Sequence, residues 1–113
     1  MDDSFISAAV AARRRVEVSS WAPGPRPVHL VEEVPPGAVV VDVREPEEGP
    51  DVGDLRLPFS TLDRWIDTLD RERQYVFHCT YGVRSELVAR ELSARGYRAL
   101  ALVGGTAAIH RAA

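Results

Sequence analysis

Three short, mostly apolar runs of residues constrain the fold of this chain more than any other feature. They span residues 38–43, 75–78 and 99–103, and turn residues such as Pro35-Pro36-Gly37 bound them. Runs of this length, rich in β-branched side chains, are typical of strands buried on both faces of a parallel sheet. A fourth, shorter run at 55–57 ends at a proline and predicts one more short strand.

Stripes of apolar residues at helical spacing separate these runs. The first stripe consists of Leu62, Trp65, Ile66 and Leu69. It predicts a helix that Ser60 or Thr61 can cap. A second helix is expected over about 84–95, with Gly96 as its C-terminal stop, and a last short helix over 106–111. Strands that alternate with helices predict an α/β domain with a mostly parallel sheet.

The 113 residues are enough for one domain of ordinary size. Residues 1–27 combine a short amphipathic stretch, which carries Arg13-Arg14-Arg15, with a proline-rich linker, and residues 28–113 are expected to form the compact domain. The arginine triplet suits a solvated helix face, with contact to tRNA or to an acidic partner as the alternative. The formal net charge of −3 argues against direct nucleic-acid binding.

Composition also excludes several other classes. No apolar run approaches the roughly 20 residues of a membrane helix, and the acidic start Met1-Asp2-Asp3 argues against a signal peptide. We therefore expect no membrane partner and a cytoplasmic location. A single cysteine cannot form an internal disulfide. His29 and His110 lie far apart with no matching ligands, so we expect no metal site.

The segment 75–85 carries the chemistry, because a buried strand ends at Cys79 and a helix begins about five residues later. Ligands of open α/β sheets bind at the carboxyl ends of strands. The backbone N–H groups of such a loop can form an anion-binding nest beside a helix N-terminus, and Gly82 supplies the necessary freedom. The loop residues expected to bind a persulfide or another anion are Thr80, Tyr81, Gly82, Val83 and Ser85.

This nest would stabilise a thiolate, whereas a lone Cys79 without such neighbours would be a small buried hydrophobe. We expect the loop, and not the core, to surround the thiol. Arg84 would add a permanent charge, and it could also brace the loop by binding its carbonyls. His78 could act as a base, but strand alternation points it away from Cys79. Asp42 and Arg44 could brace the cysteine loop or form an ordinary strand-end salt bridge.

Three segments together resemble the signatures of rhodanese-like domains. They are Asp-Val-Arg-Glu at 42–45, Cys-Thr-Tyr-Gly-Val-Arg-Ser at 79–85 and Leu-Val-Gly-Gly at 102–105. The resemblance covers about residues 28–110. It implies a central, mostly parallel five-stranded sheet flanked by helices, with Cys79 as the persulfide carrier of a sulfurtransferase. It implies no metal and no organic cofactor.

A narrower resemblance is to the C-terminal rhodanese domain of the tRNA 4-thiouridine synthetases, which also serve thiazole synthesis. Residues 57–62, 69–70 and the Cys-x-x-Gly-Val-x-Ser loop carry it. Residues 52–57 replace the Gly-His-Ile-x-Gly-Ala segment of most rhodaneses, a departure that this subfamily shares. No adenylating Ser-Gly-Gly-x-Asp-Ser segment is present, so we expect sulfur carriage in trans. The implied partners are a cysteine desulfurase as donor and a sulfur-acceptor protein or tRNA-modifying enzyme in tRNA thiolation or thiamine-thiazole synthesis.

Two other functions stay open. A thiolate in an anion cradle also suits a phosphatase or an arsenate reductase. Four residues separate Cys79 from Arg84, whereas the related phosphatases resemble Cys-x5-Arg, and the shorter ring fits a single sulfur better than a tetrahedral oxyanion. A non-catalytic interaction module of the same fold is the third possibility, although such modules usually lack the cysteine.

Overall fold

A computed structural model describes residues 30–112, which form one five-stranded sheet. The strand order is β1-β5-β4-β2-β3, and every pairing between these strands is parallel. The strands are β1 (Leu30–Val31), β2 (Val39–Asp42), β3 (Leu55–Arg56), β4 (Gln74–His78) and β5 (Arg98–Leu102). The expected parallel α/β architecture is therefore confirmed. The predictions for Arg13-Arg14-Arg15, the linker and His29 lie outside the described residues.

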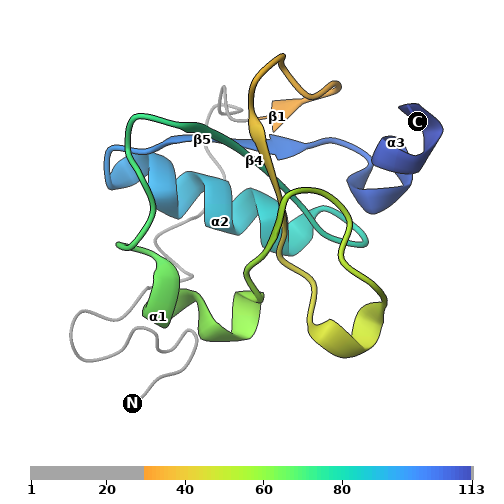
Figure 1. Ribbon diagram of the computed structural model, residues 1–113, viewed down its shortest axis with the longest axis horizontal. Coiled ribbons are helices and arrows are strands. Elements are labelled where there is room, and N and C mark those ends of the chain that lie inside the picture. Colours follow the sequence, from red (N-terminus) through yellow and green to blue (C-terminus); the bar gives the residue numbers. More distant parts are fainter. Residues whose placement is uncertain (1–29, 113) are drawn as a thin grey trace.

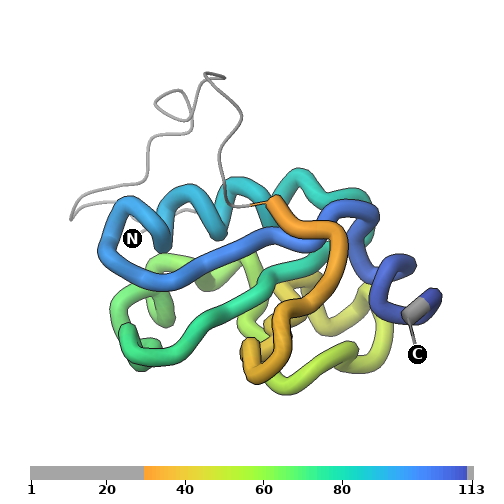
Figure 2. Tube along the Cα trace, turned by 90° about the horizontal axis from the view of Figure 1, so that it is seen from above, coloured from red at the N-terminus to blue at the C-terminus, as the bar shows by residue number. Residues whose placement is uncertain are grey.

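Over residues 30–112, two helices and two 3₁₀ turns connect the strands, and a third helix follows β5 (Figure 1). They are α1 (Leu62–Trp65), α2 (Val83–Ala94), α3 (Gly105–Ala112), η2 (Pro46–Glu48) and η3 (Phe59–Thr61). The tube in Figure 2 shows α2 running alongside β5. The second and third helices begin and end within a residue of the predicted ranges. Glycines lie at both ends of α2 and at the start of α3.

The first predicted helix was wrong in length, since α1 makes only one turn. Thr61 occupies the N-cap position, but neither side chain makes a capping bond: Ser60 binds Glu45, and the Thr61 hydroxyl donates to the Pro58 carbonyl. The helix ends where Thr68 directs its N–H and its hydroxyl to the Trp65 carbonyl. This tighter three-residue bonding replaces the next helical turn. The apolar stripe nevertheless reaches the core, because a turn of 3₁₀ type keeps similar side-chain directions.

The core lies on one face of the sheet. Alternate residues of the central strands, among them Val41 and Phe77, point to this face and are fully buried. Trp65 of α1 stacks on Phe77 with 6.2 Å between ring centroids, and Val88 and Leu92 of α2 are fully buried in the same cluster. One continuous core therefore fixes α1 and α2 relative to β4.

The carboxyl ends of β2, β4 and β5 meet at one edge of the sheet, because all three strands run parallel. Asp42 pairs with His78 across β2 and β4 at this edge. Both α2 and α3 begin here, immediately after β4 and β5. Two helix N-termini and the end of a buried strand thus converge on the segment that holds Cys79.

Candidate active site

The Cys79 sulfur occupies the position of a helix cap. The residue directly follows β4, and Sγ accepts hydrogen bonds from the N–H groups of Gly82 at 3.1 Å and Ser85 at 3.4 Å. Gly82 is the N-cap residue of α2, with φ of +89°, and it has no side chain to satisfy the first N–H groups of the helix. The sulfur supplies the missing acceptor. Negative charge on this atom is favoured by the positive end of the helix dipole.

Ser85 connects the thiol to the main chain. The Cys79 thiol donates to Ser85 Oγ at 3.5 Å, and Ser85 Oγ donates to the Gly82 carbonyl at 3.2 Å. Ser85 is fully buried, so bulk water does not compete for these bonds. When the thiol loses its proton, the hydroxyl can rotate and donate to the sulfur instead. This serine can therefore serve both states of the cysteine.

The thiol is more deeply buried than the sequence predicted. Only 1% of Cys79 is exposed, and the residue belongs to the core cluster, so the expectation that the loop alone surrounds it is wrong. Cys79 continues the inward side of Phe77 along β4, and α2 with the rest of the core covers it on that side. By contrast, Tyr81 is 89% exposed and Val83 is 66% exposed on either side of Gly82. Apolar side chains thus border the loop while its sulfur stays covered.

The start of α3 fixes the other side of the cysteine loop. The Thr106 N–H donates to the Cys79 carbonyl at 3.0 Å. A Cβ atom on Gly105 would collide with this carbonyl and would lie 2.6 Å from the Thr80 carbonyl oxygen. Glycine at this position, with φ of +65°, therefore lets α3 approach the loop backbone directly.

His78 lies on the opposite face of β4 from Cys79. Its Nε2 is 2.7 Å from the Val52 carbonyl, which can only accept, so Nε2 carries the proton. Nδ1 therefore accepts from the Thr106 hydroxyl at 2.8 Å. Burial lowers the pKa of His78, which keeps the ring neutral at pH 7. Because both ring nitrogens are engaged away from the sulfur, this geometry gives His78 a positioning role and no role as a base.

Arg84 binds Glu48 and not the carbonyls of the loop. Its Nη1 and Nη2 donate to the two Glu48 oxygens at 2.6 and 2.9 Å, and Thr80 Oγ1 donates to the same carboxylate at 3.2 Å. The hydrogen bonds from Arg84 hold the pKa of Glu48 at about 2, and the same pairing raises the pKa of Arg84. Sequence reasoning missed Glu48, because no local pattern connects residues this far apart in the chain.

Asp42 and Arg44 form a salt bridge that organises the segment before β3. Asp42 accepts from Arg44 Nε at 3.0 Å, Arg44 Nη2 at 2.9 Å, Arg56 Nη2 at 3.2 Å and the Val52 N–H at 3.1 Å. Burial alone would raise the pKa of Asp42, but the hydrogen bonds from Arg44 and Val52 lower it to about 2.

The Asp42–Arg44 pair does not contact the cysteine loop directly. Arg44 instead donates to the carbonyls of Glu48 at 3.3 Å and Pro50 at 2.8 Å. It thereby holds η2, and η2 presents the Glu48 carboxylate to Thr80 and Arg84. Glu48 therefore lies between this pair and the cysteine loop.

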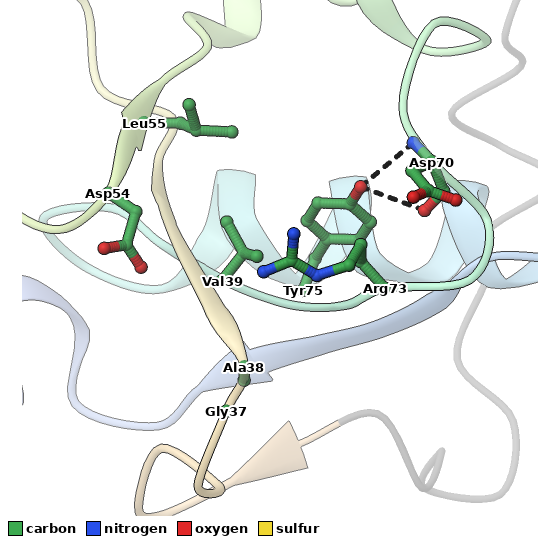
Figure 3. Close-up of a pocket in the computed structure, with 8 residues that line it drawn as sticks. All are labelled: Gly37, Ala38, Val39, Asp54, Leu55, Asp70, Arg73 and Tyr75. Atoms are coloured by element: carbon green, nitrogen blue, oxygen red, sulfur yellow. Dashed lines mark hydrogen bonds between the residues drawn. The ribbon is translucent and has the colours of Figure 1, made fainter.

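A hollow lies at the opposite edge of the sheet from Cys79. It has a volume of about 510 Å³ and lies where β2 and β4 begin, beside Val39 and Tyr75 (Figure 3). The Tyr75 hydroxyl bonds the N–H and the carbonyl of Asp70, and Asp54 accepts from the Val40 N–H. These polar groups are satisfied within the fold, and the hollow lies away from the thiol.

Residues 30–112 contain no group of three or more histidine, cysteine, aspartate or glutamate side chains arranged to hold a metal ion. None of the helices described for this part of the chain has the length and apolar character needed to cross a membrane.

Fold and site together define a class: an α/β domain with a parallel sheet, whose one cysteine follows a central strand and caps the start of the next helix. Comparison with known proteins specifies the family. Residues 28–112 match the family model described as "Rhodanese-like domain". The chain belongs to this family, which confirms the resemblance in the sequence.

Curated relatives support the narrower resemblance. A "tRNA sulfurtransferase" from Colwellia psychrerythraea is 40% identical over 78 residues, covering 63% of this chain and 16% of the relative. One from Photobacterium profundum is 34% identical over 104 residues, covering 86% of this chain and 21% of the relative. The chain therefore spans about a fifth or less of these relatives. Among solved structures, a rhodanese-related protein from Thermoplasma volcanium superimposes with a TM-score of 0.60 at 30% identity, covering 66% of this chain and 79% of that one.

Proposed function

We propose that this domain is a sulfurtransferase that carries sulfane sulfur as a persulfide on Cys79. The observation that carries the proposal is the position of Sγ, which accepts two N–H groups at the start of α2. The first turn of α2 also offers further N–H groups without acceptors inside the helix. These donors suit the outer, negatively charged sulfur of a persulfide.

The transfer consists of two displacements at sulfur. The Cys79 thiolate attacks the outer sulfur of a donor persulfide, R-S-S⁻. The donor S–S bond breaks, R-S⁻ leaves, and Cys79-S-S⁻ forms. A nucleophile on the acceptor then attacks the outer sulfur and returns the Cys79 thiolate. The sequence contains one cysteine, so a resolving thiol has to come from another molecule or domain. No cofactor beyond the covalent persulfide is required.

The names of the relatives favour tRNA thiolation as the pathway. We propose a cysteine desulfurase as the donor and a tRNA-modifying enzyme or a thiazole-forming protein as the acceptor, in the cytoplasm. A phosphatase or arsenate reductase is disfavoured by the Glu48 carboxylate, which occupies the Arg84 guanidinium that an oxyanion would need. A purely interacting module is disfavoured by the hydrogen bonds that converge on Sγ.

Intact-mass spectrometry after incubation with a cysteine desulfurase and cysteine tests the proposal. The wild-type chain should gain one sulfur atom, and the gain should disappear on adding dithiothreitol or cyanide. Cys79→Ser should gain none. Because Cys79 is buried, this variant should also lose about 1 kcal/mol of stability, and circular dichroism should confirm that it folds. A wild-type chain that never gains the sulfur, or a Ser variant that does, contradicts the proposal.

A further inference from the structure

The carboxylate of Glu48 is held in a fixed position against the anion-binding loop. Its negative charge would repel a free anion that reacts there. Glu48 Oε2 accepts from the Glu45 N–H at 2.8 Å and from Arg84 Nη1. Glu48 Oε1 accepts from Arg84 Nη2 and from the Thr80 hydroxyl. Thr80 directly follows Cys79, so three of these four donors, from Thr80 and Arg84, hold the carboxylate against the cysteine loop.

The pairing removes the positive charge that the loop would otherwise offer. Arg84 is the one cationic residue between Cys79 and Ser85, and it lies in the chain between Gly82 and Ser85, whose N–H groups bind Sγ. Both terminal nitrogens of its guanidinium point to Glu48. The side chains of Arg84 and Glu48 are 27% and 28% exposed, so the pair is partly shielded from water and its charges largely cancel.

We propose that Glu48 determines the donor specificity of this site: by neutralising Arg84, it makes the loop discriminate against free dianionic sulfur donors such as thiosulfate and favours persulfides. This inference rests on the proposed sulfur-carrier function and names the substrate class of the same site.

The two donors differ in the charge that the site must accommodate. With thiosulfate, the Cys79 thiolate attacks the outer sulfur, the S–S bond breaks, and sulfite leaves with two negative charges beside the new Cys79-S-S⁻. With a persulfide R-S-S⁻, the leaving group is a thiolate with one negative charge. Two N–H groups on Sγ suffice for the monoanion, whereas the dianion would need a free cation. Glu48 pairs with Arg84, so this cation is not free, and the Glu48 carboxylate also repels the dianion.

Glu48→Gln tests this inference because it removes the charge and keeps the shape. The measurement is the rate of sulfur loading on Cys79 by intact mass, with thiosulfate and with cysteine persulfide as separate donors. We expect the ratio of the thiosulfate rate to the persulfide rate to rise by about tenfold, the effect of one unit charge several ångströms away in a partly shielded site. Glu47→Gln is the matched control, since Glu47 lies on the same 3₁₀ turn, and its ratio should equal that of wild type.

The double variant Glu48→Gln/Arg84→Gln separates the two ways in which Glu48 could act. If Glu48 acts by occupying Arg84, the gain in the ratio should be lost when both side chains are changed. An unchanged ratio in Glu48→Gln, an equal gain in Glu47→Gln, or a full gain in the double variant overturns the inference. A wild-type chain that takes sulfur from neither donor refutes the proposed function as well. Loading from cysteine persulfide without a shift in the ratio refutes only the role of Glu48.

Discussion

Gly105→Ala should destabilise the domain and impair its cysteine loop, because the new methyl group would overlap main-chain atoms. The added Cβ would lie 2.6 Å from the Thr80 carbonyl oxygen, about 0.8 Å inside ordinary van der Waals contact, and nearer still to the Cys79 carbonyl oxygen. Backbone atoms cannot rotate away as a side chain can. The start of α3 therefore has to move off the loop, and the hydrogen bond from the Thr106 N–H to the Cys79 carbonyl is lost.

The magnitude follows from three contributions. A side chain at φ of +65° destabilises the native state by about 1–2 kcal/mol. Overlap in a packed site adds about 1–3 kcal/mol, and the lost hydrogen bond adds about 1 kcal/mol. Gly37→Ala is the matched control, because Gly37 has a similar φ of +83° but nothing within 4 Å of its added Cβ. It should show only the first contribution.

Urea unfolding and sulfur loading of both variants check this reasoning. Gly105→Ala should lose at least about 2 kcal/mol more free energy of unfolding than Gly37→Ala, and it should load sulfur on Cys79 more slowly. Gly37→Ala should load like wild type, since Gly37 lies at the opposite edge of the sheet beside the Figure 3 hollow. Equal stability of the two variants would refute the contact between α3 and the cysteine loop.

Three further predictions concern buried polar groups. Asp42→Asn should destabilise the fold by about 3 kcal/mol, measured by urea unfolding, because it leaves the guanidinium of Arg44 without its buried counter-charge; a loss below 1 kcal/mol would contradict this. Stability should fall as pH drops below about 6.5, because the lowered pKa of His78 makes the unfolded chain bind a proton first. The stability should fall again from about pH 4 towards pH 2, because Asp42 has a pKa of about 2 in the folded state against 3.8 in the unfolded state. His78→Gln should remove only the decline that begins near pH 6.5. Ser85→Ala should slow sulfur loading by about tenfold while leaving the fold intact, since it deletes the hydroxyl that accepts from the Cys79 thiol and can donate to the thiolate. An unchanged loading rate would show that this hydroxyl does not contribute to sulfur transfer.

Much of the cysteine loop was predictable because its elements are contiguous in the chain. A buried strand, one cysteine, a glycine and a helix occupy residues 75–94, and hydrogen bonds over three to six residues complete the cradle around Sγ. The direction of His78 also followed from strand alternation. The burial of Cys79 did not, because it depends on α2 and on the rest of the core packing against that face of β4.

The length of α1 was not predictable from its apolar stripe. The stripe records which side chains face the core, and that requirement is met by one α-helical turn followed by tighter turns. The competing bonds of Thr68 to the Trp65 carbonyl decided where the helix ends. Periodicity therefore identified the buried residues Leu62, Trp65 and Ile66 correctly but overestimated the regular helix.

The parallel α/β fold and the thiol at the end of β4 could be predicted from the order of the residues, because apolar periodicity and loop glycines are local properties. The electrostatics of the site could not, because they depend on contacts between residues far apart in the chain. The Glu48–Arg84 pair joins residues 36 positions apart, and Gly105 meets the carbonyls of Cys79 and Thr80 across two parallel strands. Such contacts depend on the order of the strands and on where helices end. The charge of Glu48 and the missing side chain of Gly105 matter to the site because folding of the sheet brings Arg84 and the loop carbonyls next to them.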